Sequence, residues 1–276
     1  MGLSLGFSPC PNDTFIFGPL INGLVNSPFS FKEVIDDIEG LNEMALNSKL
    51  DISKVSCHVL GYITDKYYFL PVGAALGRGC GPLLVTKNRS LKDLHGAHVA
   101  VPGRFTTAYL LLMLYGPAFK VSFVPFNQIM QALKKEEFDF GLIIHEGRFL
   151  IDKYGLKNVL DLGKWWEEKT KLPLPLGGIV AKRSLDREII DKFTVLLRES
   201  IEYAFSYPER IKDYVKKYAS YLEDSVITEH IRLYVNNYTT DFGNEGKEAI
   251  RMLFLLAKEK GIFRKNLPLD IIYDLS

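Results

Sequence analysis

Short apolar segments of strand length alternate with amphipathic segments of helical length from residue 3 to residue 163. The predicted strands are 3–8, 29–36, 51–56, 82–87, 96–103, 119–126, 139–145 and 158–163. The predicted helices among them are 11–23, 41–49, 106–116 and 127–138. Strands that alternate with short helices form strand–helix–strand units and build parallel sheets, so the predicted fold class is α/β.

The C-terminal third of the chain has the apolar spacing of long helices. Ile190, Phe193 and Leu197 recur on one face of the segment 187–205, and the segment 248–261 repeats the pattern. Spacing of this kind is typical of helices that cover a core. We therefore assign these faces to packing and not to catalysis.

Polar residues mark the predicted starts of the helices. Asn12 or Asp13 suits the N-cap of the first helix, and Thr106 or Thr107 suits that of the third. Gly116 is a fitting end for the third helix.

Two stretches rich in glycine and proline, 77–87 and 172–183, each lead into one apolar strand. We interpret them as crossings between two lobes. Lobe 1 is then discontinuous, with residues 1–82 plus 180–276, and lobe 2 is the insert 83–179. Open α/β sheets bind ligands beside the carboxyl ends of their strands, so the predicted site is a cleft between the lobes.

Composition and charge exclude several classes of function. The chain has 276 residues, of which 47% are hydrophobic and 24% charged, with a formal net charge of +1. This balance is typical of a globular protein and provides no basic field for nucleic acid or an anionic membrane. The sequence has no uninterrupted apolar stretch of bilayer-spanning length and no pattern of a signal peptide, so a cytoplasmic location is expected.

Motifs for metals and nucleotides are missing from the sequence. The three cysteines, Cys10, Cys57 and Cys80, are far apart and form no C-x-x-C pair, which favours reduced thiols over a zinc site or disulfides. No G-x-x-x-x-G-K-[ST] motif occurs, and the glycines of 77–81 precede a strand and not a helix.

Two polar stretches follow predicted strands of lobe 1. Ser8 and Asn12 lie in "SPCPNDT", where a helix begins and an anion could bind, although capping alone explains these residue types. Ser56 ends the strand 51–56 and could donate into the cleft. Lys54 and His58 could each contact a ligand or have a structural role.

Two further candidates lie in lobe 2. Thr106 and Thr107 open a helix, where free amides and two hydroxyls suit a carboxylate or phosphate, or a simple cap. His145 ends the buried strand "DFGLII" at the predicted cleft, where it could accept a proton or be a structural histidine. Arg148 is a candidate clamp for a carboxylate, or a surface residue.

The strings "LGFSPCPNDTFIF", "VPGRFTTAYLL", "GLIIHEGRF" and "DLGKWWEEKTKLPLPLGGIVAKR" closely resemble the 1,4-dihydroxy-6-naphthoate synthase family of the futalosine route to menaquinone. The resemblance runs from Leu3 to about Thr240. It implies an α/β, two-lobed type II periplasmic-binding-protein-like fold with two crossover strands. It also implies a lyase that converts cyclic dehypoxanthine futalosine, a small carboxylate, to 1,4-dihydroxy-6-naphthoate.

The resemblance further implies roles for single residues. His145 matches the catalytic base, and the substrate contacts match Lys54, Val55, Ser56, Thr106 and Thr107. No metal or organic cofactor, nucleic acid or membrane partner is implied, and the oligomeric state stays open. At "SCHVLG" this chain departs from the family pattern, which leaves the roles of Cys57 and His58 open.

Two other functions are compatible with the sequence. One is a solute-binding or sensor protein of the same fold, without chemistry. The other is the sister enzyme of the pathway, a dehydratase that acts on chorismate. The histidine in "GLIIHE" favours the naphthoate synthase.

Overall fold

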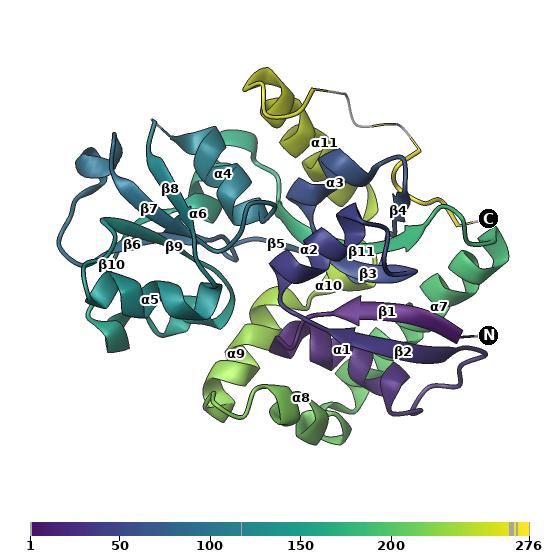
Figure 1. Cartoon of the computed structure of the whole chain (residues 1–276). Helices are drawn as coiled ribbons and strands as arrows, with labels where there is room; N and C mark the ends of the chain where they lie inside the picture. Colours follow the sequence, from purple (N-terminus) through teal and green to yellow (C-terminus); the bar gives the residue numbers. More distant parts are fainter. Residues whose placement is uncertain (1, 117, 265–267, 269, 276) are drawn as a thin grey trace.

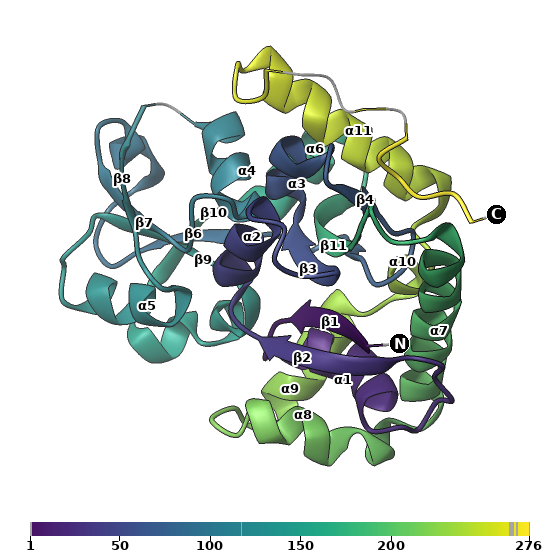
Figure 2. The same ribbon diagram turned by 45° about the vertical axis from the view of Figure 1, so that its right-hand side comes forward.

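The computed structural model of the chain describes residues 2–116, 118–264, 268 and 270–275. It has two sheets, each flanked by helices, and Figure 1 shows them as two lobes joined through β5 and β11. No helix in the described ranges combines the length and the apolar character needed to span a membrane. Figure 2 shows that the C-terminal helices all lie with the lobe that contains the N-terminus.

The sheet of lobe 1 has the strand order β2-β1-β3-β11-β4, with β5 also paired to β11. Its strands are β1 (Gly2–Phe7), β2 (Ser30–Ile35), β3 (Ile52–Ser56), β4 (Tyr67–Phe69), β5 (Ala75–Gly77) and β11 (Leu174–Lys182). The strand β1 is parallel to both β2 and β3, whereas β11 is antiparallel to β3, β4 and β5.

The sheet of lobe 2 has the order β10-β6-β9-β7-β8. Its strands are β6 (Leu83–Thr86), β7 (His98–Val101), β8 (Lys120–Phe123), β9 (Phe140–Ile143) and β10 (Lys157–Asp161). The strand β7 is parallel to β8 and β9, but β6 is antiparallel to both β9 and β10.

The predicted strands all exist, but the prediction of parallel sheets is wrong in part. Every antiparallel pairing involves β6 or β11. These are the strands that follow the two crossings between the lobes, from β5 to β6 and from β10 to β11. A chain that leaves one sheet and later returns enters it without a strand–helix–strand unit, so the rule that makes such units parallel does not apply. The strand β11 belongs to the lobe 1 sheet from Leu174 onward, so the expected lobe boundary at 179/180 falls inside this strand.

The helices that precede β11 in the chain are α1 (Pro11–Ile21), α2 (Ile38–Leu46), α3 (Cys57–Ile63), α4 (Thr107–Tyr115), α5 (Phe126–Lys134) and α6 (Leu162–Thr170). The C-terminal helices are α7 (Arg187–Ser206), α8 (Lys212–Tyr218), α9 (Asp224–Tyr234), α10 (Asn237–Thr240) and α11 (Gly243–Glu259). The described residues also form four 3₁₀ turns: η1 (Leu91–Leu94), η2 (His145–Phe149), η3 (Ile151–Tyr154) and η4 (Pro208–Arg210).

The start of α1 differs from the prediction. Cys10 is the N-cap, and Pro11 is the first helical residue. Proline is well suited to that position because its missing amide hydrogen needs no partner there and its φ is already helical. The predicted caps Asn12 and Asp13 therefore lie inside the first turn, with their side chains free for other contacts.

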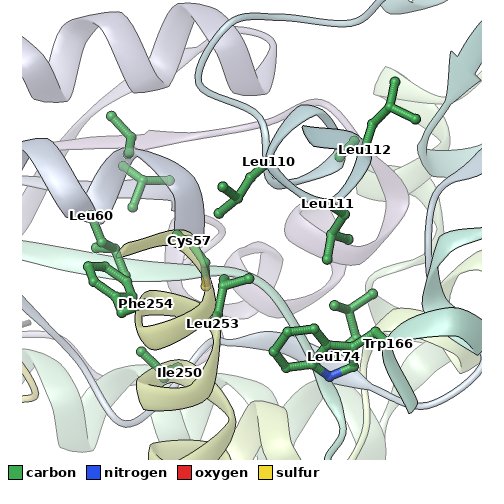
Figure 3. Close-up of a cluster of buried hydrophobic side chains, with 14 of the residues drawn as sticks. Cys57, Leu60, Leu110, Leu111, Leu112, Trp166, Leu174, Ile250, Leu253 and Phe254 are labelled. Atoms are coloured by element: carbon green, nitrogen blue, oxygen red, sulfur yellow. The ribbon is translucent and has the colours of Figure 1, made fainter. Parts of the chain in front are cut away.

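One hydrophobic core extends across both lobes. Figure 3 shows Leu110, Leu111 and Trp166 of lobe 2 near Leu253 and Phe254 of lobe 1. Each of these side chains is at most 4% exposed. The lobes thus share apolar packing on this side of the molecule, away from the polar residues described next.

Candidate active site

A narrow cleft lies between the lobes, with a cavity of about 80 Å³, which is smaller than a typical small-molecule pocket (roughly 300–1,000 Å³). Residues of both lobes line it: Ser8, Asn12, Asp13, Ile38, Lys54, Val55, Ser56, Ala75, Cys80, Pro82, Thr106, Thr107, Ala108, Ile144, His145, Leu176, Gly177 and Tyr234. All the predicted site residues except Arg148 are in this lining.

Four of the polar lining residues end or follow strands. Ser8 follows β1, Ser56 ends β3, Thr106 follows β7, and His145 follows β9. The sheets end at this cleft with their parallel strands pointing into it, so each strand delivers a side chain to the same space.

A dense network of hydrogen bonds holds the lobe 1 side of the cleft. The Asp13 carboxylate accepts from the amide and the hydroxyl of Ser8 at 3.2 and 2.7 Å. It also accepts from the Asn12 Nδ2 at 2.8 Å and forms an ion pair with the Lys54 Nζ at 2.9 Å. Asp13 is 1% exposed and is the only carboxylate among the described residues that line the cleft. A buried charge with this many partners is fixed in place.

Lys54 and Ser56 use their polar atoms differently. The Lys54 Nζ also donates to the Gly73 carbonyl at 3.3 Å, so its charge belongs to the lobe 1 network. The Ser56 Oγ accepts from the Asn42 Nδ2 at 3.0 Å. Its own hydroxyl proton has no acceptor among the described residues, which leaves it for a ligand.

The two threonines of lobe 2 commit their hydroxyl protons to the protein. Thr106 is the N-cap of α4; its Oγ1 accepts from the Tyr109 amide at 3.3 Å and donates to the Gly103 carbonyl at 2.9 Å. The Thr107 Oγ1 donates to the Leu176 carbonyl at 2.6 Å. The first amides of α4 still lack partners within the helix, as at every helix start. An anion at this point would therefore meet amides rather than threonine hydroxyl protons.

His145 is the first residue of η2 and has a φ of 55°. A non-glycine residue in this left-handed region is uncommon, and such residues cluster at functional sites. The His145 imidazole makes no hydrogen bond to any other described residue, so a ring nitrogen is available to a ligand. Burial lowers the pKa of His145, while the charges of Glu146 and Asp13 oppose the shift. A neutral imidazole is the form that can accept a proton.

Two residues near His145 were not found from the sequence. His230, on α9, stacks its ring on that of His145 with the centroids 6.4 Å apart. Tyr221, between α8 and α9, donates to the Glu146 Oε1 at 2.9 Å. Only tertiary packing brings these C-terminal residues to the cleft, and no local pattern marks them.

Arg148 and His58 lie outside the cleft lining. The Arg148 Nη1 donates to the Gly81 carbonyl at 3.3 Å, beside the first crossing between the lobes. The His58 Nδ1 lies 3.2 Å from the Thr106 carbonyl, and burial lowers its pKa to about 4. Their placement favours structural roles, and the carboxylate clamp at Arg148 stays a prediction.

The fold and the cleft define a two-lobed α/β protein of the periplasmic-binding-protein type. The alkanesulfonate-binding protein SsuA of Xanthomonas axonopodis pv. citri superposes with a TM-score of 0.73 at 12% identity, over 99% of this chain and 98% of that one. A crystallised protein of Archaeoglobus fulgidus is closer, with a TM-score of 0.91 and 38% identity, over 95% of this chain and 98% of that one. The predicted fold is confirmed.

The family model described as "Menaquinone biosynthesis" matches residues 3–259. A 1,4-dihydroxy-6-naphthoate synthase of Thermus thermophilus is 46% identical over 94% of this chain and 95% of its own length. One of Streptomyces coelicolor is 41% identical over 94% of each chain. The chain therefore belongs to the menaquinone-biosynthesis family, and it is an enzyme; the lyase class predicted for it is consistent with the names of these relatives.

Proposed function

We propose that this enzyme cleaves cyclic dehypoxanthine futalosine to 1,4-dihydroxy-6-naphthoate, with His145 as the base. The observation that carries the proposal is the unpaired imidazole of His145, held in the cleft opposite the fixed Asp13–Lys54 pair. The names of the two relatives support the product, and the carboxylate of the proposed substrate suits the donors of the cleft.

In this proposal, the substrate carboxylate binds between the hydroxyl of Ser56 and the first-turn amides of α4. Ser56 offers the free proton described above, and the helix start adds amides and the positive end of the helix dipole. Thr106 and Thr107 would then contribute through their backbone, and Val55 would pack against the ring. The carboxylate does not take part in the reaction, so this contact orients the substrate.

The proposed reaction requires only that the protein orient the substrate and transfer a proton. His145 takes a proton from a C–H bond of the substrate, and that electron pair forms the new double bond of the ring as it becomes aromatic. The bond to the sugar-derived fragment breaks, its electron pair leaves with the fragment, and the fragment takes up the proton from His145. Aromatisation supplies driving force, so the proposed reaction uses no cofactor, and the closed cleft excludes water. A location in the cytoplasm remains a prediction from the sequence.

The test is direct. The purified protein is incubated with cyclic dehypoxanthine futalosine and, separately, with chorismate, and the products are identified by mass spectrometry. Formation of the naphthoate from the first substrate alone supports the proposal. Dehydration of chorismate would identify the sister activity instead, and ligand binding without product would identify a binding protein.

A further inference from the structure

His230 contacts both walls of the cleft, the wall formed by lobe 1 and the wall formed by lobe 2. It is fully buried on α9, and its Nε2 lies 2.8 Å from the Oδ1 of Asn12, in the first turn of α1. Its ring is nearly parallel to that of His145, with an angle of 17° between the planes. His230 therefore contacts Asn12 on the lobe 1 wall and His145 on the lobe 2 wall, although it does not line the cleft.

The direction of each hydrogen bond in this chain follows from Asp13. The Asp13 carboxylate is paired with Lys54, so it can only accept. The atom of Asn12 that faces it at 2.8 Å must be the amide nitrogen, which places the Asn12 carbonyl oxygen toward His230. The Nε2 of His230 must then carry the hydrogen, and Nδ1, which has no partner among the described residues, keeps its lone pair.

We propose that His230 is a positioning residue for this reaction: by donating from Nε2 to Asn12 it fixes the amide orientation that holds the Asp13 carboxylate, and its ring supports that of His145. The inference rests on the proposed function of the cleft. Without the donor, the Asn12 carbonyl would lose its partner, and only the bond to Asp13 would hold the amide in this orientation. An amide that turned over would point its carbonyl at the Asp13 oxygen, and the repulsion would displace the carboxylate and its partner Lys54.

Displacement of Asp13 matters because it is the negative charge of the lobe 1 wall. When His145 accepts a proton it becomes a cation, which the charges of Glu146 and Asp13 favour and that of Lys54 opposes. A misplaced Asp13 therefore slows the chemical step. It leaves binding of the substrate carboxylate, at Ser56 and α4, nearly unchanged.

The experiment compares His230→Phe with His230→Gln. Phenylalanine keeps a ring but removes the donor, whereas the glutamine amide can donate to Asn12 again. We expect kcat of His230→Phe to fall roughly tenfold to a hundredfold through the displaced Asp13 charge, since each tenfold loss of rate corresponds to only about 1.4 kcal/mol of transition-state stabilisation. KM should stay within about twofold, because only the chemical step is affected. His230→Gln should recover most of kcat.

Ser200 provides the matched control. Like His230, it is fully buried and tied to α1 from a distant helix, with its hydroxyl donating to the Ile16 carbonyl at 2.7 Å, but it lies away from the cleft. Ser200→Ala should lower the thermal unfolding temperature and leave kcat intact. An equal loss of kcat in Ser200→Ala and His230→Phe, or a normal kcat in His230→Phe, would show that His230 is only structural.

NMR of 15N-labelled histidine tests the hydrogen-bond chain without any turnover. The wild-type protein should show His230 as the neutral tautomer with the hydrogen on Nε2. A hydrogen on Nδ1 would overturn the inference even if His230→Phe failed to fold. Absence of turnover in the wild type would instead contradict the proposed function, and the tautomer would still report on Asn12.

Discussion

The two walls of the cleft are built in opposite ways. On the lobe 1 wall, Asp13 has four hydrogen-bonding or ionic contacts to Ser8, Asn12 and Lys54. On the lobe 2 wall, His145 has a left-handed backbone and no hydrogen bond from its ring to the described residues. The charged pair of the lobe 1 wall is satisfied before a ligand arrives, whereas the His145 ring of the lobe 2 wall has no hydrogen-bond partner among the described residues.

This difference suggests a division of labour. A fixed ion pair supplies a constant electric field at no cost of reorganisation during the reaction. A ring nitrogen without a protein partner is free to exchange a proton with a substrate. In the proposed reaction, the wall that reacts is thus distinct from the wall that stabilises, and the following experiments change one wall at a time.

The largest effect is expected for His145. His145→Ala should lower kcat by about 10²–10⁴-fold, the usual contribution of a general base. His145→Gly should be equally inactive but should keep its thermal unfolding temperature, because glycine adopts a positive φ without steric cost. Turnover and unfolding are measured on both variants. Near-normal turnover in either would remove His145 from the mechanism.

The pH dependence of kcat/KM should follow the same residue. Burial lowers the pKa of His145 below its ordinary value of 6.5, against the charges of Glu146, Asp13 and Asp37 and with that of Lys54. The active neutral form therefore persists below pH 6.5. Below the lowered pKa, activity should fall by about tenfold for each pH unit. An acidic limb centred above pH 6.5 would show that His145 is not the titrating base.

On the lobe 1 side, Ser56→Ala should weaken binding. The hydroxyl of Ser56 has a proton free for the substrate carboxylate, and a hydrogen bond to a charged group is worth roughly 1.5–3 kcal/mol. KM should rise by on the order of tenfold to a hundredfold, with a much smaller change in kcat. A wild-type KM in this variant would place the carboxylate elsewhere, with Arg148 the next residue to test.

The sequence placed candidate residues on both walls of the cleft, but it did not reveal the contacts that hold the lobe 1 wall together. His145 was found because an apolar strand ends in a histidine, and Thr106 because it has the right type and place for a cap; the structure puts both at the cleft. Both signals are local. The predicted strands were found for the same reason, since their apolar runs are short and bounded by turn residues, whereas the three-residue strands β4 and β5 were not predicted.

The stabilising wall depends on contacts between distant segments. Asp13 was expected to be a cap, and only the fold shows that Lys54 reaches it. His230 lies 218 residues from Asn12 in the sequence. Neither the antiparallel crossing strands nor these partners leave a local pattern, because register and burial are set by the whole lobe.

A smaller loss of activity is expected for a change at Tyr221, where the two lobes meet. Tyr221 of lobe 1 donates to Glu146 of lobe 2, whose second oxygen is buried without a partner among the described residues. Tyr221→Phe would leave this carboxylate unpaired, next to His145. We expect a loss of about tenfold in kcat/KM, since such a group costs roughly 1–3 kcal/mol.

The control for Tyr221 is an ion pair at the same seam. Lys153 and Glu223 are 2.7 Å apart, but both side chains are more than half exposed. Exposed pairs contribute about 0–1 kcal/mol, so Lys153→Ala should be close to wild type. If the two variants behave alike, the contact of the exposed Tyr221 with the buried Glu146 has no special role.

The smallest effect on activity is expected for Thr107. Its hydroxyl donates to the Leu176 carbonyl on β11, so Thr107→Val leaves that carbonyl unpaired at the crossing between the lobes. The unfolding free energy should fall by roughly 1–3 kcal/mol. KM should change by no more than about threefold, because the amide of residue 107 still faces the ligand.

Thr106→Val should likewise lower the unfolding free energy by about 1 kcal/mol through the lost cap. KM and thermal unfolding are measured for both variants beside Ser56→Ala. A rise in KM as large as that of Ser56→Ala would mean that the threonine hydroxyls exchange their protein partners for the substrate, and that the lobe 2 wall also binds through its side chains.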